Sequence, residues 1–207
     1  MAISESVLTD LAQTPYAEIR DAVQDGDILL CSAHDFFSRL IRWATKSPWS
    51  HCAIAFRMEE IDRVLVLEAV EKLGVRCVPL SAFLKRTSSG LEPYPGDIVL
   101  ARHKGLAAKS RARPMKKMAD FAFDRLGDKF SHREMFKIIL RIALGRINRH
   151  MPKILVSDDE FICSEYVAKC FEQVGIKIAW DGAGFIAPAD IALDLKMEAV
   201  ARFALAA

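Results

Sequence analysis

The stretch FICSEYV, residues 161–167, places a cysteine where a helix is expected to begin. From residue 162 to 174 apolar residues recur at intervals of three and four, and Gly175 is a typical residue after a helix end. The unpaired N–H groups at a helix start stabilise a thiolate. Cys163 is therefore a candidate nucleophile. The alternative is a small buried cysteine, the commonest role of this residue type.

A second stretch, SHCAI at residues 50–54, places a histidine at the start of an expected strand, residues 51–57. Alternation along that strand puts His51 on one side with two alanines, which leave room for another element to approach. The opposite side faces the core with Cys52, Ile54 and Phe56. An imidazole that reaches Cys163 would hold its sulfur as a thiolate, so convergence of the two stretches predicts a cysteine-nucleophile enzyme.

Glu68 is an ionisable residue inside an otherwise apolar expected strand, residues 64–70. If residues 58–61 form a hairpin loop, position 57 pairs with 62, and His51 faces Glu68. A buried carboxylate needs a partner, and there it would orient the imidazole and stabilise its protonated form. A slip of one residue would move Glu68 to the other face. The alternative is an edge-strand residue that faces water.

Composition narrows the class of protein. The chain has 207 residues, of which 52% are apolar, and we expect one domain over 1–207 with a real core. A net charge of +2 gives no case for nucleic acid. The five cysteines are odd in number and irregularly spaced, which fits reduced thiols in a cytoplasmic protein rather than a disulfide framework. No histidine has metal-ligand spacing, and we expect neither a metal nor a cofactor.

The order of the expected elements predicts an α+β fold. Strands are expected at 27–31, 51–57, 64–70, 74–80 and 97–101, and helices at 34–46, 81–86, 107–126, 132–147, 162–174 and from residue 188. Strands cluster in the first half and helices flank them, so the sheet should be small and mostly antiparallel. Two of the expected strands begin with the same three residue types, Gly26-Asp27-Ile28 and Gly96-Asp97-Ile98.

The histidine, glutamate and cysteine, in this order, resemble the permuted papain-like enzymes of the YaeF/YiiX type, relatives of NlpC-type cell-wall peptidases. The shared pattern covers residues 24–190: the Gly-Asp-Ile strand entry at 26–28, Ser-His at 50–51, a glutamate at 68 and Cys-Ser-Glu at 163–165. The resemblance implies a circularly permuted papain-like fold, a small half-barrel sheet flanked by helices. It also implies that Cys163 is the nucleophile, His51 the general base and acid, and Glu68 the orienting residue.

The same resemblance suggests residues that contact the substrate: Ser50, Ser164, Glu165 and Phe130. The family's usual Gly-x-x-Tyr-Asp segment corresponds here to residues 127–131, where Phe130 and Ser131 replace the tyrosine and the aspartate. We expect a hydrolase that cleaves the amide bond of a peptide or an amino-acid amide through an acyl-enzyme.

A basic apolar segment, residues 132–153, carries six lysines and arginines and one acid. It is expected to be a core helix with a solvated basic edge, and lies between the histidine and the cysteine, where it could cap the active site. As an alternative, a cationic helix of this kind binds an anionic membrane surface or a lipid-like ligand. This keeps two other functions open: a thiol-dependent lipid esterase or acyltransferase, and a lipid- or peptide-binding domain without turnover.

Overall fold

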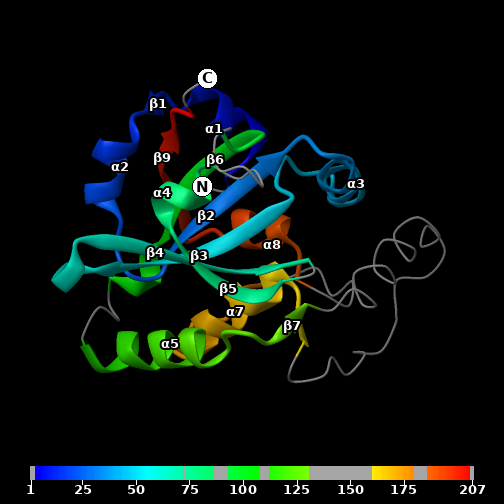
Figure 1. Ribbon diagram of the computed structural model, residues 1–207. Helices are drawn as coiled ribbons and strands as arrows, with labels where there is room; N and C mark the ends of the chain where they lie inside the picture. Colours follow the sequence, from blue (N-terminus) through cyan, green and yellow to red (C-terminus); the bar gives the residue numbers. More distant parts are fainter. Residues whose placement is uncertain are drawn as a thin grey trace.

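Seven strands form one twisted sheet in the computed structural model, which describes residues 3–71, 73–85, 93–107, 112–130, 160–179 and 186–205 (Figure 1). In spatial order the strands are β1 (Gln13–Thr14), β9 (Met197–Phe203), β6 (Gly96–His103), β2 (Asp27–Ala33), β3 (His51–Met58), β4 (Arg63–Val70) and β5 (Gly74–Pro79). Every neighbouring pair is antiparallel except β1 with β9. A second, two-stranded sheet pairs β7 (Lys129–Phe130) with β8 (Glu160–Phe161) in parallel. The expected α+β, mostly antiparallel fold is confirmed.

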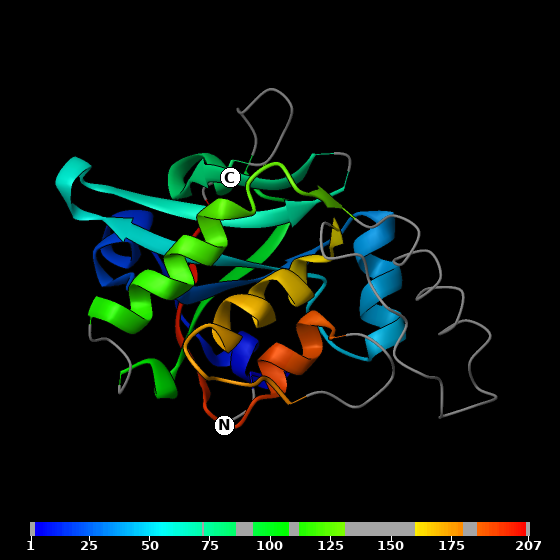
Figure 2. The ribbon, with the colours of Figure 1, turned by 90° about the horizontal axis from the view of Figure 1, so that it is seen from below.

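Helices cover both faces of the large sheet (Figures 1 and 2). One face packs against α1 (Glu5–Asp10), α5 (Ala112–Asp124), α7 (Cys163–Glu172) and α8 (Pro188–Leu193). The other packs against α2 (Tyr16–Ala22) and α4 (Leu80–Phe83). Single turns, η1 (Glu59–Ile61) and η2 (Lys104–Leu106), complete the described elements. None of the described helices has both the length and the apolar character needed to span a membrane.

The two Gly-Asp-Ile sequences make the same kind of contact at the starts of two strands. Gly26 and Gly96 have φ of 83° and 152°, a backbone region open to glycine, and each lies at the start of one of the paired strands β2 and β6. The aspartate that follows each glycine binds an arginine of a neighbouring strand: Asp27 binds Arg102 on β6, and Asp97 binds Arg202 on β9. The aspartates of the two Gly-Asp-Ile sequences therefore link three adjacent strands near their ends.

The sequence analysis missed β9. It ended on a helix from residue 188, whereas α8 stops at Leu193 and the chain returns as a strand between β1 and β6. The segment MEAVARF contains methionine, glutamate and alanine, which favour helix locally, and pairing with β6 overrides that preference. Strands therefore do not cluster only in the first half of the chain.

Helix α3 (Phe36–Thr45) fills the connection between β2 and β3. Asp35 caps its start by accepting from the Ser38 backbone N–H at 3.0 Å, and Lys46 ends it in a left-handed conformation. Figures 1 and 2 show α3 at the same end of the molecule as the start of α7. The helix expected at 132–147, and the cap expected at 132–153, lie outside the described residues.

Candidate active site

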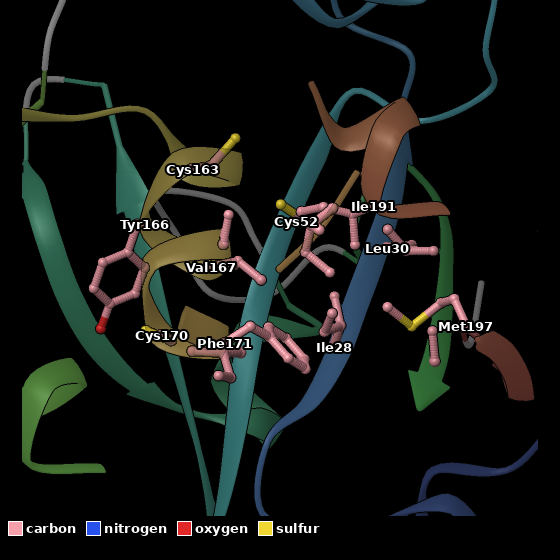
Figure 3. Close-up of a cluster of buried hydrophobic side chains, with 14 of the residues drawn as sticks. Ile28, Leu30, Cys52, Cys163, Tyr166, Val167, Cys170, Phe171, Ile191 and Met197 are labelled. Atoms are coloured by element: carbon pink, nitrogen blue, oxygen red, sulfur yellow. The ribbon is translucent and has the colours of Figure 1, made fainter. Parts of the chain in front are cut away.

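Cys163 is the first residue of α7, as its sequence environment predicted. Val167, Cys170 and Phe171 follow on the buried side of the helix, which packs on β3 and β4 (Figure 3). The Cys163 side chain belongs to the same buried cluster as Cys52, near the start of β3. In the first turn of a helix backbone N–H groups lack intrahelical acceptors, so they are available to a negative charge at this position.

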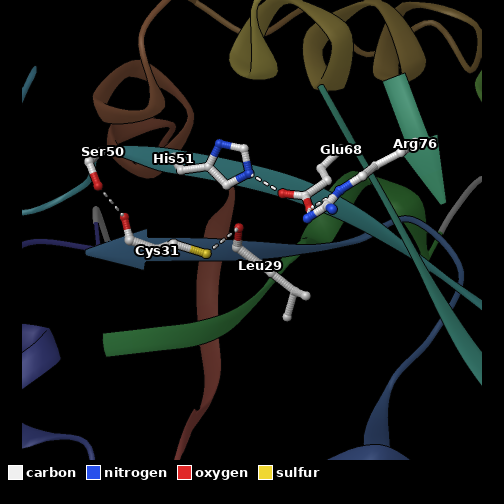
Figure 4. A network of polar contacts seen from close by, with 6 residues as sticks. All are labelled: Leu29, Cys31, Ser50, His51, Glu68 and Arg76. Carbon is white, nitrogen blue, oxygen red and sulfur yellow. Dashed lines mark hydrogen bonds and ion pairs between the residues drawn. The ribbon is translucent and has the colours of Figure 1, made fainter. Parts of the chain in front are cut away.

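His51 is the first residue of β3 and contacts Glu68 of β4, with 2.6 Å between Nε2 and Oε2 (Figure 4). The predicted contact is confirmed, but the register behind it was wrong: Arg57 pairs with Val64, not with residue 62. A shift of two residues leaves side-chain alternation unchanged, so Glu68 stays on the predicted face and reaches His51 diagonally.

The sequence analysis also predicted the wrong side of β3 for the approach of another element. The two alanines beside His51 are buried in the core under α2 and α4, so no open space lies over them. Helix α7 instead packs on the side that carries Cys52, Ile54 and Phe56. His51 lies at the very start of the strand, and its side chain is 12% exposed there.

A residue that the sequence analysis did not consider completes the network. Arg76 of β5 lies directly opposite Glu68, and its Nε and Nη2 donate to Glu68 Oε1 at 2.9 and 2.6 Å. The Glu68 side chain is fully buried, so its charge needs this partner. The arginine holds one carboxylate oxygen and leaves the other for the imidazole (Figure 4).

The electrostatics couple His51 to Cys163. Burial disfavours the charged imidazole, but the negative charge of Cys163, a hydrogen bond to it and the carboxylate of Glu68 outweigh burial and raise the pKa of His51 from 6.5 to about 9. The Glu68 carboxylate accepts a hydrogen bond from His51 Nε2, so Nε2 carries a proton. Nδ1 is then available to the Cys163 sulfur. This shift favours the imidazolium form of His51 next to a thiolate.

Cys52 contributes to the thiolate. A hydrogen bond from the Cys52 side chain is the largest cause that lowers the pKa of Cys163; burial opposes it, and the charge of His51 adds to it. The pKa of Cys163 falls well below the usual 9.0, whereas burial raises that of Cys52 well above it, so the proton stays on Cys52. The sequence analysis took Cys52 for a core residue. It is one, and it also contacts the candidate nucleophile.

Cys170 shows what the same residue type does elsewhere on α7. It lies two turns after Cys163, fully buried, and burial raises the pKa of its thiol far above the ordinary value. Both observations fit a structural role for Cys170. Position at the helix start and contact with His51, rather than residue type, distinguish the two cysteines.

Two of the suggested substrate contacts use their hydroxyl groups inside the protein. Ser50 Oγ accepts from the Ala33 N–H at 3.2 Å and donates to the Cys31 carbonyl at 3.3 Å, which ties the α3 connection to β2. Ser164 Oγ donates to the Ile186 carbonyl at 2.5 Å and so fastens the chain before α8 to α7. Both side chains are buried, and a contact of either with substrate stays a prediction.

The other two suggested contacts lie beside the cysteine helix. Glu165, in the first turn of α7, forms an ion pair with Lys169 at 3.8 Å. Phe130 lies in β7, whose backbone pairs with Phe161 of β8, two residues before Cys163. Ser131 lies outside the described residues. Neither placement tests a role in substrate binding.

Arg76 was within reach of sequence reasoning. The short connection 71–73 joins two strands, and a tight hairpin there places residue 76 opposite residue 68, an arginine facing a glutamate. The donation from Cys52 had no comparable signal, because only the packing of α7 on β3 brings the two sulfur atoms together.

Comparison with solved structures gives a similar fold. The crystal structure of the metalloprotein yiiX from Escherichia coli O157:H7 matches with a TM-score of 0.60 and 19% sequence identity, covering 86% of this chain and 96% of that chain. The described residues of the present chain contain no group of three histidine, cysteine or acidic side chains placed to hold a metal, so we derive no step from one. No curated protein matches the chain.

The family comparison is more specific. Residues 22–181 match the model of permuted papain-like amidase enzymes, YaeF/YiiX, C92 family. This range includes His51, Glu68 and Cys163 and leaves out α1, α8 and β9. The matching range, the fold and a cysteine at a helix start agree with one another, and the chain belongs to the YaeF/YiiX-type family of permuted papain-like cysteine amidases.

Proposed function

We propose that the protein hydrolyses an amide bond of a peptide or amino-acid amide through a Cys163–His51–Glu68 triad. The observation that carries the proposal is the 2.6 Å contact of His51 Nε2 with Glu68, on an imidazole whose pKa is raised to about 9 by its thiolate and carboxylate neighbours. A thiolate and an imidazolium, held together, are the reactive state of a cysteine hydrolase.

In the first half of the reaction the Cys163 sulfur attacks the carbonyl carbon and a C–S bond forms. Negative charge moves to the carbonyl oxygen, close to the backbone N–H groups of the first turn of α7. The C–N bond then breaks, and His51 transfers its Nδ1 proton to the leaving amine. The product of this half is a thioester on Cys163 and a free amine.

In the second half water attacks the thioester while neutral His51 accepts a proton from it. The C–S bond breaks, the acid leaves and the thiolate–imidazolium pair is restored. Glu68 stays ionised throughout, because its role is to hold the Nε2 proton and favour the imidazolium. Arg76 keeps the carboxylate in place from the other side.

The test compares the wild-type protein with Cys163→Ala and His51→Gln on fluorogenic aminoacyl and peptidyl amides. We expect both variants to lose turnover by about a thousandfold or more, and only the wild type to accumulate a thioester that hydroxylamine traps. Cys77→Ala is the matched control, because Cys77 is half-buried on β5 outside the network. Amide turnover that survives Cys163→Ala would end the proposal. Turnover of lipid acyl esters instead of amides would change the proposed substrate from an amide to an ester.

A further inference from the structure

A basic cleft lies along α3 and the residues that lead into β3. It measures about 710 Å³ and is bordered by α3 and the start of α1. Three cations line it, Arg39, Arg42 and Lys46, together with the indole of Trp43; Glu5 is the acid among its lining residues. The sequence analysis took this helix only as an element with apolar spacing and assigned no function to it.

Among the described residues no ion pair involves Arg39, Arg42 or Lys46. Arg42 donates one Nη1 hydrogen bond to the Ala33 carbonyl at 3.4 Å, which leaves its other donors available. Three cations within about two helical turns repel one another, so the cleft favours an anion that accepts from several of them at once.

An aromatic surface accompanies the charge. Trp43 is 67% exposed in the middle of this basic group, and no residue of α3 is fully buried. Water-exposed indole beside guanidinium groups is suited to a ligand that carries both an apolar portion and a negative charge. The cleft therefore has complementary chemistry for an acidic organic molecule rather than for a free inorganic ion.

Two chain connections tie the cleft to the reacting histidine. Pro48, on the cleft lining, precedes His51 by three residues, so their Cα atoms lie no more than about 11 Å apart. His34, also on the lining, follows Cys31 by three residues, and Cys31 pairs with His51 across β2 and β3. Figures 1 and 2 agree, since α3 and the start of α7 lie at the same end of the sheet.

We propose that this cleft, whose lining residue Pro48 lies no more than about 11 Å from His51, binds a carboxylate or phosphate group of the substrate and so selects acidic amides. The proposal rests on the proposed function for its substrate and adds the specificity. Arg39 and Lys46 bind the anion, and Trp43 contacts the apolar part between the anion and the amide.

The test uses a thiol reagent that spans the two sites. N-iodoacetyl-ε-aminocaproate alkylates a thiolate, forming a C–S bond and releasing iodide, and its carboxylate lies at the required distance from the reactive carbon. The neutral partner is the same molecule with a primary carboxamide. We expect the acid to saturate Cys163 labelling at about tenfold lower concentration than the amide, with equal maximal rates.

The double variant Arg39→Gln/Lys46→Gln should remove this difference and leave the maximal rate unchanged. Lys104→Gln/Lys116→Gln is the control: it removes the same charge from exposed lysines elsewhere, paired with Glu198 and Asp120, and should keep the difference. Equal constants for the two reagents, or a difference that survives Arg39→Gln/Lys46→Gln, overturn the proposal. Equal constants together with sedimentation on phosphatidylglycerol vesicles would assign the cations to a membrane surface instead.

The two proposals fail in different ways. If neither reagent labels Cys163 faster than an ordinary thiol, the proposed function fails. The cleft is then tested by calorimetric titration of N-acetyl-ε-aminocaproate against its carboxamide on the same chain. Tighter binding of the acid, lost in Arg39→Gln/Lys46→Gln, supports the cleft without any reaction at Cys163; equal binding overturns it.

Discussion

Two fully buried carboxylates, Glu68 and Asp27, each meet an arginine of a neighbouring strand, yet they use their second oxygen differently. Asp27 gives both oxygens to Arg102, at 2.7 Å each, and Oδ2 also accepts from the Gln24 N–H at 2.9 Å. Glu68 gives Oε1 to both donors of Arg76 and keeps Oε2 for His51.

The difference separates a structural pair from one that we propose takes part in the reaction. Asp27 is saturated by groups that never change their charge in the neutral range, so it fastens β2 to β6. Glu68 binds Arg76 through one oxygen, and its other oxygen meets His51, a group that exchanges a proton during the proposed reaction. A buried carboxylate alone thus does not indicate a site; the partner of its second oxygen does.

The largest effect is expected from Glu68→Gln. The amide can donate to Nε2, which favours the wrong tautomer of His51 and removes the charge that stabilises the imidazolium. Amide turnover, measured as kcat/KM, should fall about a thousandfold, which is about 4 kcal/mol of barrier. A decrease of less than about threefold, in a variant that folds normally by circular dichroism, would give Glu68 the same structural role as Asp27.

The matching substitution at the other buried carboxylate is Asp27→Asn. It leaves Arg102, which is mostly buried, without its charge partner, and should lower the free energy of unfolding by about 2 kcal/mol. The turnover of the folded fraction should stay as in the wild type. Urea unfolding and active-site titration measure the two quantities separately, and a large loss of turnover with normal stability would reverse the comparison.

A smaller effect is expected from Arg76→Gln. Arg76 is a positioning residue, because it contacts Glu68 and not the reacting atoms. Losing its fork frees the carboxylate to move, and kcat should fall about tenfold while KM stays unchanged. Arg76→Lys keeps the charge without the fork and should recover part of the loss. Equal decreases in stability and in kcat, with no rescue by lysine, would indicate that Arg76 is merely structural.

The two regions should also differ in pH dependence. The pKa of His51 is raised to about 9, so its contribution to stability is complete below about pH 6.5 and is lost as pH rises through about 9. Turnover needs the imidazolium and should decline over the same alkaline range. Unfolding free energies at pH 6.5 and 10 should differ more for the wild type than for His51→Gln, whereas Asp27→Asn should parallel the wild type.

The smallest effect is expected from substitutions of Cys52. Since its hydrogen bond is the largest cause of the low pKa of Cys163, Cys52→Ala should raise that pKa and move the acid limb of iodoacetamide labelling to higher pH. Cys52→Ser keeps a donor and should leave the limb close to its original position. Identical profiles for the alanine and serine variants would show that packing, and not donation, is the contribution of Cys52.

Much of this site followed from local patterns. A cysteine at a helix start, a histidine at a strand start and one acid in an apolar strand each have a short-range signature, because capping and alternation act over a few residues. The contact of His51 with Glu68 survived a register error because the error was an even number of residues. The arginine opposite Glu68 could have been found from the hairpin, whereas β9 could not, since its local composition favours helix.

Residue types and their order along the chain thus suffice to recognise the family by resemblance and to propose Cys163, His51 and Glu68 as its site residues. Packing alone determines the rest: which side of β3 receives α7, that Cys52 lowers the pKa of Cys163, and that a basic cleft forms along α3. Those arrangements depend on contacts between segments up to more than a hundred residues apart, and no local pattern encodes the distance between them.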